Sequence, residues 1–159
     1  MISLRKTKTW QDNLNDVIRD VFFVDEELLD LMLIPSEERE DIIGFIKQYL
    51  IRSIAPDEIL TDERVRVCYS EEAGRLIGSN ILKKYLYFDI YVKTEDLHNC
   101  GDDLLAFRTM LIAQRLQELL TDQKYVCRID FNYEDEYDLY TKLVGYTRYR
   151  IVFSYKISF

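Results

Sequence analysis

Hydrophobic and polar residues alternate along two long stretches of the chain. Within residues 82–93, every second position is aliphatic or aromatic: Leu86, Phe88, Ile90 and Val92. Tyrosines and Asp89 occupy the positions between them, and residues 146–159 repeat the same period with arginines and Lys156 in between. Because successive side chains of a strand point to opposite faces of a sheet, this period predicts two long strands, each with one buried face.

Shorter alternating runs predict two further strands, at residues 64–70 and 125–133. Residues 71–80 contain Gly74 and Gly78 and are predicted to form a long hairpin loop. The acidic residues that follow the 125–133 strand are predicted to form a second loop before the last strand. Together these segments predict two hairpins.

Helical spacing of apolar residues appears in four places. Residues 103–121 carry a wide apolar stripe after Asp102 and Asp103, either of which could cap the helix, so we expect a long helix packed on the sheet. The first 60 residues predict three shorter helices. The expected segments are residues 9–22, which begin in a capping-box-like pattern, residues 25–33, and a third helix that Ser36 caps and Ala55-Pro56 ends.

The expected fold class is therefore α+β, with a mainly antiparallel β-sheet in the order β-β-α-β-β and one packed helix. Residues 1–60 form an N-terminal arm and helical segment, and residues 61–159 form the sheet domain. A chain of 159 residues is the size of one ordinary domain, so the two parts are expected to make one compact unit.

Net charge narrows the choice of partners. The chain carries 21 basic and 29 acidic residues, for a net charge of −8. The acidity is concentrated in residues 1–60, where 7 basic and 13 acidic residues give −6. Bare nucleic acid is a poor partner for such a surface, because phosphate binding needs a basic footprint. No apolar run is long enough to span a membrane, so no membrane partner is expected.

The sequence contains no pattern typical of a catalytic, metal-binding or cofactor-binding site. The chain has one histidine and three cysteines, an odd number that favours reduced thiols in a cytosolic compartment. His98 and Cys100 lack a second pair at zinc-ligand spacing, and the glycines do not form a phosphate-binding loop. Asp89 has no acidic partner at a fixed spacing for a nuclease-like metal site. We expect no catalytic residue, metal or cofactor, and hence not an enzyme.

Two groups of opposite charge near the C-terminus are candidate interface residues. The acidic group is Glu134, Asp135, Glu136 and Asp138, and the basic group is Arg148, Arg150 and Lys156. They could be ordinary solvated residues with weak local ion pairs, each contributing about 0–1 kcal/mol. Alternatively, the acidic group of one copy could face the basic group of the next in a head-to-tail contact that closes a ring. The sequence leaves both interpretations open.

The layout of residues 62–159 resembles a family of ring-forming proteins at the neck of tailed bacteriophages, the tail terminator (tail-completion) proteins and their head–tail joining relatives. The resemblance rests on a long strand pair, one amphipathic helix, a further strand, a polar loop and a closing aromatic strand that contains residues 143–153. It implies a structural subunit without cofactor or reaction. It also implies a homo-oligomeric ring of six or twelve subunits, assembled in the host cytoplasm, that joins the capsid connector to neighbouring tail proteins in the virion.

A second class of function is consistent with the composition. A small acidic chain with 12 tyrosines could be a phage-encoded inhibitor that mimics DNA and acts on a host enzyme. The charge distribution argues against this alternative, because residues 61–159 carry 14 basic and 16 acidic residues, a net charge of only −2.

Overall fold

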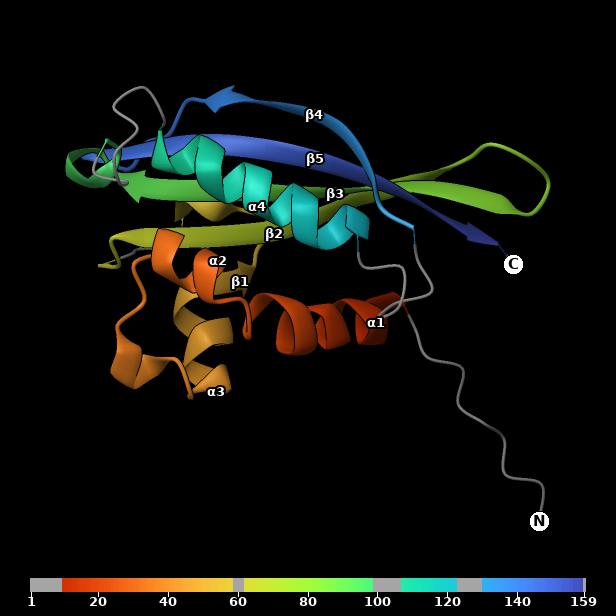
Figure 1. The fold of residues 1–159 in the computed structure, drawn as a ribbon. Coiled ribbons are helices and arrows are strands. Elements are labelled where there is room, and N and C mark those ends of the chain that lie inside the picture. The colour runs from red at the N-terminus through yellow and green to blue at the C-terminus, as the bar shows by residue number, and fades with distance from the viewer. Residues whose placement is uncertain (1–9, 59–61, 99–106, 123–129, 159) are drawn as a thin grey trace, which may run out of the picture.

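The computed structural model describes residues 10–58, 62–98, 107–122 and 130–158, which are built around a five-stranded sheet (Figure 1). The strands are β1 (Leu50–Arg52), β2 (Val65–Leu76), β3 (Ile81–Lys93), β4 (Asn132–Leu139) and β5 (Tyr146–Ser158). They lie in the order β1-β2-β3-β5-β4. Only β1 and β2 are parallel, and the other neighbours are antiparallel. The predicted α+β fold with a mainly antiparallel sheet is confirmed.

Helices form a second layer. The longer ones are α1 (Trp10–Val17), continued by the π-helix η1 (Ile18–Phe22), α2 (Glu26–Leu31) and α4 (Arg108–Asp122). The shorter ones are η2 (Ser36–Glu38), α3 (Ile42–Gly44), η3 (Phe45–Tyr49), η4 (Pro56–Glu58) and η5 (Thr94–Asp96). Helix α4 lies along β3 and β5, with α2 and η1 beside it (Figure 1). None of the described helices is both long and apolar enough to cross a membrane.

The core lies between this helical layer and one face of the sheet, which we call the helix face. The four alternating apolar residues of β3 predicted to share a buried face are all fully buried there: Leu86, Phe88, Ile90 and Val92. Phe88 is central, because its ring packs in T-shaped contacts against Phe22 and Phe153. The ring centroids are 6.0 Å and 5.9 Å apart, respectively. Core residues come from both the first 60 residues and the remainder of the chain.

Two charged contacts hold the helices together. Asp25 caps α2 by accepting a hydrogen bond from the Leu28 amide at 2.9 Å, and it also binds Arg115 of α4 through two bonds of 2.9 and 2.6 Å. Arg108, almost fully buried at the start of α4, donates to the carbonyls of Asp96 and Leu31, each at 3.0 Å. These contacts fix α2 and α4 relative to each other.

Two predicted boundaries in the sheet are wrong. The expected loop at residues 71–80 is mostly strand, because β2 continues to Leu76 through an irregularity between Glu72 and Arg75. Gly74 permits this, since a Cβ there would lie 2.6 Å from the side chain of Leu82. The expected acidic loop is strand β4, at the edge of the sheet. Charged side chains are common on edge strands, because one side of the strand remains open to water.

The N-terminal half contains a third difference. The predicted third helix ends at Tyr49, and the next three residues form β1 beside β2. Its cap is Asp41, which accepts from the Gly44 amide at 3.0 Å, and not Ser36, which lies in η2. The predicted caps at Thr9 and at Asp102 or Asp103, and most of the predicted 125–133 strand, lie outside the described residues.

Candidate functional site

A buried carboxylate marks the face of the sheet opposite the helix face. Asp89 is in the middle of β3 and is only 1% exposed. Its neighbours across the sheet are Cys68 on β2 and Arg150 on β5. A charge so well removed from water requires partners that replace its hydration.

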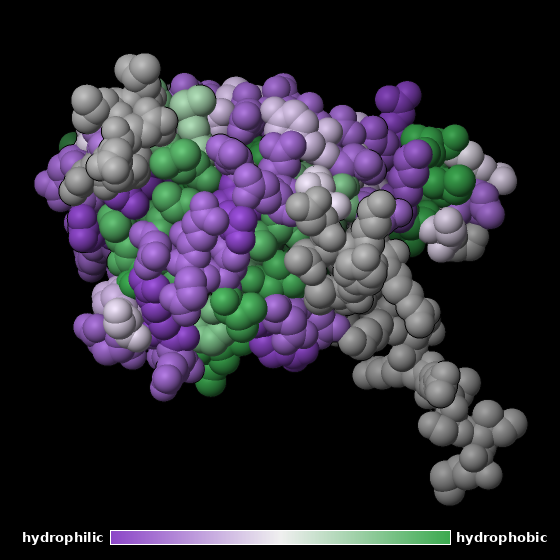
Figure 2. All heavy atoms as spheres, viewed as in Figure 1, coloured by the Kyte–Doolittle hydropathy of each residue, from purple (hydrophilic) through white to green (hydrophobic). Residues whose placement is uncertain are grey.

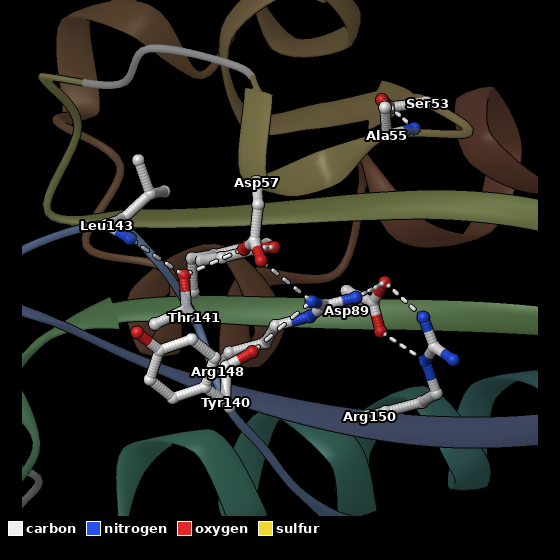
Figure 3. Close-up of polar contacts among 10 residues, drawn as sticks. Ser53, Ala55, Asp57, Asp89, Tyr140, Thr141, Leu143, Arg148 and Arg150 are labelled. Carbon is white, nitrogen blue, oxygen red and sulfur yellow. Dashed lines mark hydrogen bonds and ion pairs between the residues drawn. The ribbon is translucent and has the colours of Figure 1, made fainter.

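Two arginines of β5 supply those partners (Figure 3). Arg150 binds Asp89 through both carboxylate oxygens, Nε to Oδ1 at 2.6 Å and Nη2 to Oδ2 at 2.9 Å. Arg148 adds a contact from Nη2 to Oδ2 at 3.1 Å. Because β5 alternates its side chains, both arginines reach the same face of the sheet. Each guanidinium also lies near a tyrosine ring, Arg150 over Tyr87 and Arg148 over Tyr91.

A second carboxylate reaches the same face from the segment that follows β1. Asp57, in η4, accepts a hydrogen bond from Arg148 Nη1 to Oδ2 at 3.2 Å. Its other oxygen accepts from the hydroxyls of Tyr91 and Thr141, each at 2.7 Å. Thr141 belongs to the turn between β4 and β5, so this carboxylate joins three separate parts of the chain. We call Asp57, Asp89, Arg148 and Arg150 the charge cluster.

The charge cluster has two negative and two positive side chains, so it is neutral as a unit. Burial alone would raise the pKa of Asp57, but hydrogen bonds from Tyr91 and Thr141 and the charge of Arg148 outweigh it and lower the pKa below its ordinary value. Burial and the bond to Asp57 raise the pKa of the Tyr91 hydroxyl. The buried Arg148 Nε has no acceptor among the described residues.

An open pocket of about 260 Å³ adjoins the charge cluster. Its lining consists of Ala55, Pro56, Asp57, Glu58, Lys142 and Arg148. The chain on either side of the lining residues, within residues 53–58 and 140–145, also carries large apolar side chains that are strongly exposed. These side chains are Ile54 at 92%, Tyr140 at 82% and Val144 at 97%. The pocket therefore has a lining with two acidic and two basic side chains, and we call this region the pocket end.

The predicted basic group is divided in the structure. Arg148, Arg150 and Lys156 share one face of β5, as their spacing requires, but Arg148 and Arg150 are half-buried partners of Asp89. Lys156 is exposed and lies eight residues from Arg148, roughly 27 Å along the strand. Whether these residues also contact another copy stays a prediction.

The predicted acidic group lies on β4. Glu134 is held by the Ser154 hydroxyl and by Lys83 Nζ at 3.2 Å, and this hydrogen bonding lowers its pKa. Asp135 accepts from the Glu136 amide at 2.8 Å, and Asp138 is exposed. In the described part of the chain, none of these four carboxylates bonds to Arg148 or Arg150, so they remain on the surface as candidate interface residues.

Two of the residues considered as a nucleophile or a metal ligand, Cys68 and His98, lie in the described part of the chain. Cys68 is buried on β2, and burial raises the pKa of its thiol to about 12, which makes it a poor nucleophile. His98 is exposed, with its ring against Phe107. No group of three metal-ligating side chains gathers among the described residues. Cys100 and Cys127 lie outside the described residues.

Sequence reasoning missed Asp57, Tyr91 and Thr141 as members of one site. A signal was present in the sequence, because Asp89 in one predicted strand and Arg148 and Arg150 in another all occupy the polar positions of a period-two pattern. Opposite charges facing each other on neighbouring strands are favourable, but the register that aligns them is not visible in the sequence. Nothing in the sequence marks Asp57 as their partner.

This fold and this site define a small α+β domain in which the carboxylates and guanidiniums of the charge cluster bind one another. Residues 25–155 match the protein family described as YomW, and the chain belongs to that family. The family is of the phage and Bacillus prophage type, which indicates a phage protein. No curated protein matches the chain.

Proposed function

We propose that this protein is a structural subunit of a phage virion, in a neck or tail-end ring that joins the capsid connector to the tail. The observation that supports this proposal is the combination of a phage-type family with a β-β-α-β-β antiparallel sheet, the layout on which the resemblance to tail terminator proteins rests. The proposed partners are further copies of the same chain, in a ring of six or twelve, and the adjoining connector and tail proteins.

The charge cluster suits a structural role. Its carboxylates and guanidiniums bind one another, and Asp57 ties the segment after β1 and the β4–β5 turn to β3 and β5. A ring subunit needs such rigidity at its contact surfaces, because ordering loops on binding would weaken the contact. The exposed acidic residues of β4 and Lys156 are the proposed polar rim of a contact between copies, where charge pairs set register more than affinity.

Deletion of the gene from the phage that carries it tests this proposal. The expected result is DNA-filled heads and separate tails in electron micrographs of the lysate, with joined particles restored by the chain supplied from a plasmid. A matched control supplies the chain with Glu40→Gln, an exposed change outside the candidate interface residues, which should restore joining as well as the wild type does. Joined, infectious particles in the absence of the chain would contradict the proposal. An acidic inhibitor of a host enzyme would leave the particles intact and change only their yield.

A further inference from the structure

Strand β4 is an edge of the sheet, and its second side pairs with no other described strand. It is last in the strand order and pairs with β5. Six of its eight residues are exposed. Figure 2 shows mainly hydrophilic residues along the upper edge of the molecule, where β4 runs in Figure 1. An exposed edge presents unpaired backbone amides and carbonyls, which a further strand can bind.

The charges of β4 restrict which strand can be added. Asp135, Glu136 and Asp138 form no ion pair with a described residue, whereas Glu134 is already bound to Lys83. A second β4 strand placed alongside would set carboxylates against carboxylates, and like charges opposite each other on neighbouring strands are destabilising. The edge therefore disfavours another copy of β4 and favours a basic strand.

Both faces of this edge combine a tyrosine ring with a carboxylate. Tyr133, Glu136 and Asp138 lie opposite core residues of β5 on the helix face, whereas Asp135 and Tyr137 lie opposite residues of the other face. The irregularity between Tyr133 and Asp135 sets this pattern, because one residue there has no direct partner on β5. Tyr133 and Tyr137 are 39% and 38% exposed, so each ring offers apolar surface to an added strand.

The sequence of residues 1–9, which lie outside the described residues, matches this edge. The segment holds Arg5, Lys6 and Lys8, no acidic residue, and neither glycine nor proline. In a strand, Leu4, Lys6 and Lys8 share one face and Arg5 lies on the other. One face of the segment therefore runs from apolar to basic, as the helix-face side of β4 runs from Tyr133 to its carboxylates.

We propose that residues 1–9 of one copy add to the edge of β4 in a second copy, as a strand parallel to β4. The parallel direction follows from the order of the side chains, because the antiparallel direction would set the lysines against Tyr133 and Leu4 against the carboxylates. Opposite charges then face each other along the edge. The register pairs Leu4 with Tyr133, Arg5 with Asp135, Lys6 with Glu136 and Lys8 with Asp138.

The same copy cannot supply this strand. Lys8 is two residues before Trp10, the first residue of α1, so their Cα atoms are at most about 7 Å apart. Helix α4 packs against both η1 and β4, and Figure 1 shows α1 and β4 on opposite sides of it. Packed helix axes lie about 8–10 Å apart and β4 lies a further layer away, so Lys8 does not reach Asp138 within one copy.

The contact joins two different surfaces, so each copy can give its segment to one neighbour and accept a segment from another. Repeating it generates a ring when the rotation between copies closes and a filament when it does not. The inference rests on the proposed role in a ring and deepens it, but its test needs no virion.

Sedimentation velocity of full-length variants over a concentration series tests the charge pairing. The arm variant is Arg5→Glu with Lys8→Glu, and the edge variant is Asp135→Lys with Asp138→Lys. Exposed residues away from β4 give controls of matched charge, namely Lys47→Glu with Arg75→Glu and Glu37→Lys with Glu40→Lys. Circular dichroism first checks each variant for wild-type secondary structure. The wild type and both controls should self-associate alike, and the arm and edge variants should each do so about tenfold more weakly.

Mixing the two weakened variants tests the pairing of these two surfaces. The reversed arm complements the reversed edge, and the edge variant keeps a wild-type arm for the wild-type edge of the arm variant. An equimolar mixture should therefore regain wild-type self-association. A further variant, Leu4→Pro with Thr7→Pro, keeps all three basic residues but removes amides on both sides of the added strand, and should also associate about tenfold more weakly.

Four results would overturn the proposal. They are an arm variant that associates as the wild type does, a mixture as weak as its components, a proline variant of undiminished affinity, and a wild type that stays monomeric up to its solubility limit. Controls weakened as much as the arm and edge variants would do so too, because net charge alone would then set the association. Loss of this contact leaves the virion role to be judged by gene deletion, and intact joining after deletion leaves this contact standing.

Discussion

Removal of the Asp89 carboxylate should strongly destabilise the fold. The side chain is 1% exposed and binds two guanidiniums, of which Arg148 is 12% and Arg150 is 22% exposed. Asp89→Ala leaves both cations partly buried without their shared anion. Breaking a buried pair in this way costs about 3–5 kcal/mol of unfolding free energy. Asp89→Asn keeps the shape and one acceptor oxygen, so its cost should be smaller, roughly 1.5–3 kcal/mol.

Urea unfolding followed by circular dichroism measures these changes, provided that the dependence on urea stays the same between variants. The control is Asp138→Asn on β4, where an exposed carboxylate should change stability by no more than about 0.5 kcal/mol. The double variant Asp89→Ala with Arg150→Ala should cost less than the sum of its two parts by about 0.5–3 kcal/mol, because the residues interact directly. If Asp89→Ala resembles the control, the charge cluster does not hold the sheet together as described.

Three further predictions concern single residues. The hydrogen bond from Arg115 lowers the pKa of Asp25. The stability that this carboxylate adds is therefore complete above its unfolded pKa of about 3.9 and is lost as pH falls through its folded value. The difference in urea midpoint between wild type and Asp25→Asn should be large at neutral pH and shrink in acid. Gly145→Ala should cost about 1–2 kcal/mol through its backbone φ of 81° alone, since a Cβ there meets nothing within 4 Å, whereas Gly78→Ala, equally open but without positive φ, should be near neutral. The Cys68 thiol, with its pKa raised to about 12, should react with a thiol reagent only after unfolding, and fast labelling of that residue in the native protein would contradict its burial.

The sheet was predictable from the sequence because its signal is local. The period of two in β3 and β5 follows from one face packing against helices, and Phe88 and Phe153 are buried on the side that the pattern indicated. Helix α4 was predictable for the same reason, since its apolar stripe repeats with helical spacing.

Strand β4 was not predictable, because its sequence reads as a polar loop. Glu134, Asp135, Glu136 and Asp138 give it a hydrophilic pattern, and only backbone pairing with β5 makes it a strand. Such pairing is a long-range contact that side-chain propensity does not report. Strand β1 was not predicted for a related reason, because its three residues are too few to show a period.

The charge cluster depends on register and on a distant segment. Arg148 and Arg150 were identified as candidates for a contact with another copy, and the structure gives them partners within the chain. Their alignment with Asp89 requires the β3–β5 register, and Asp57 arrives from 32 positions earlier in the chain than Asp89. Short-range patterns carry no information about either, which explains why the residues were found and their partners were not.

The copy number of this chain in purified virions tests the proposed function most directly. Particles from a density gradient are digested, and peptides of this chain are quantified by mass spectrometry against isotope-labelled standards, with a capsid-connector peptide as the internal reference. A ring subunit should be present at a fixed count of six or twelve per particle, and the count should not change on repeated purification. Absence of the chain from infectious particles, or a trace amount that declines with each gradient, would contradict the account.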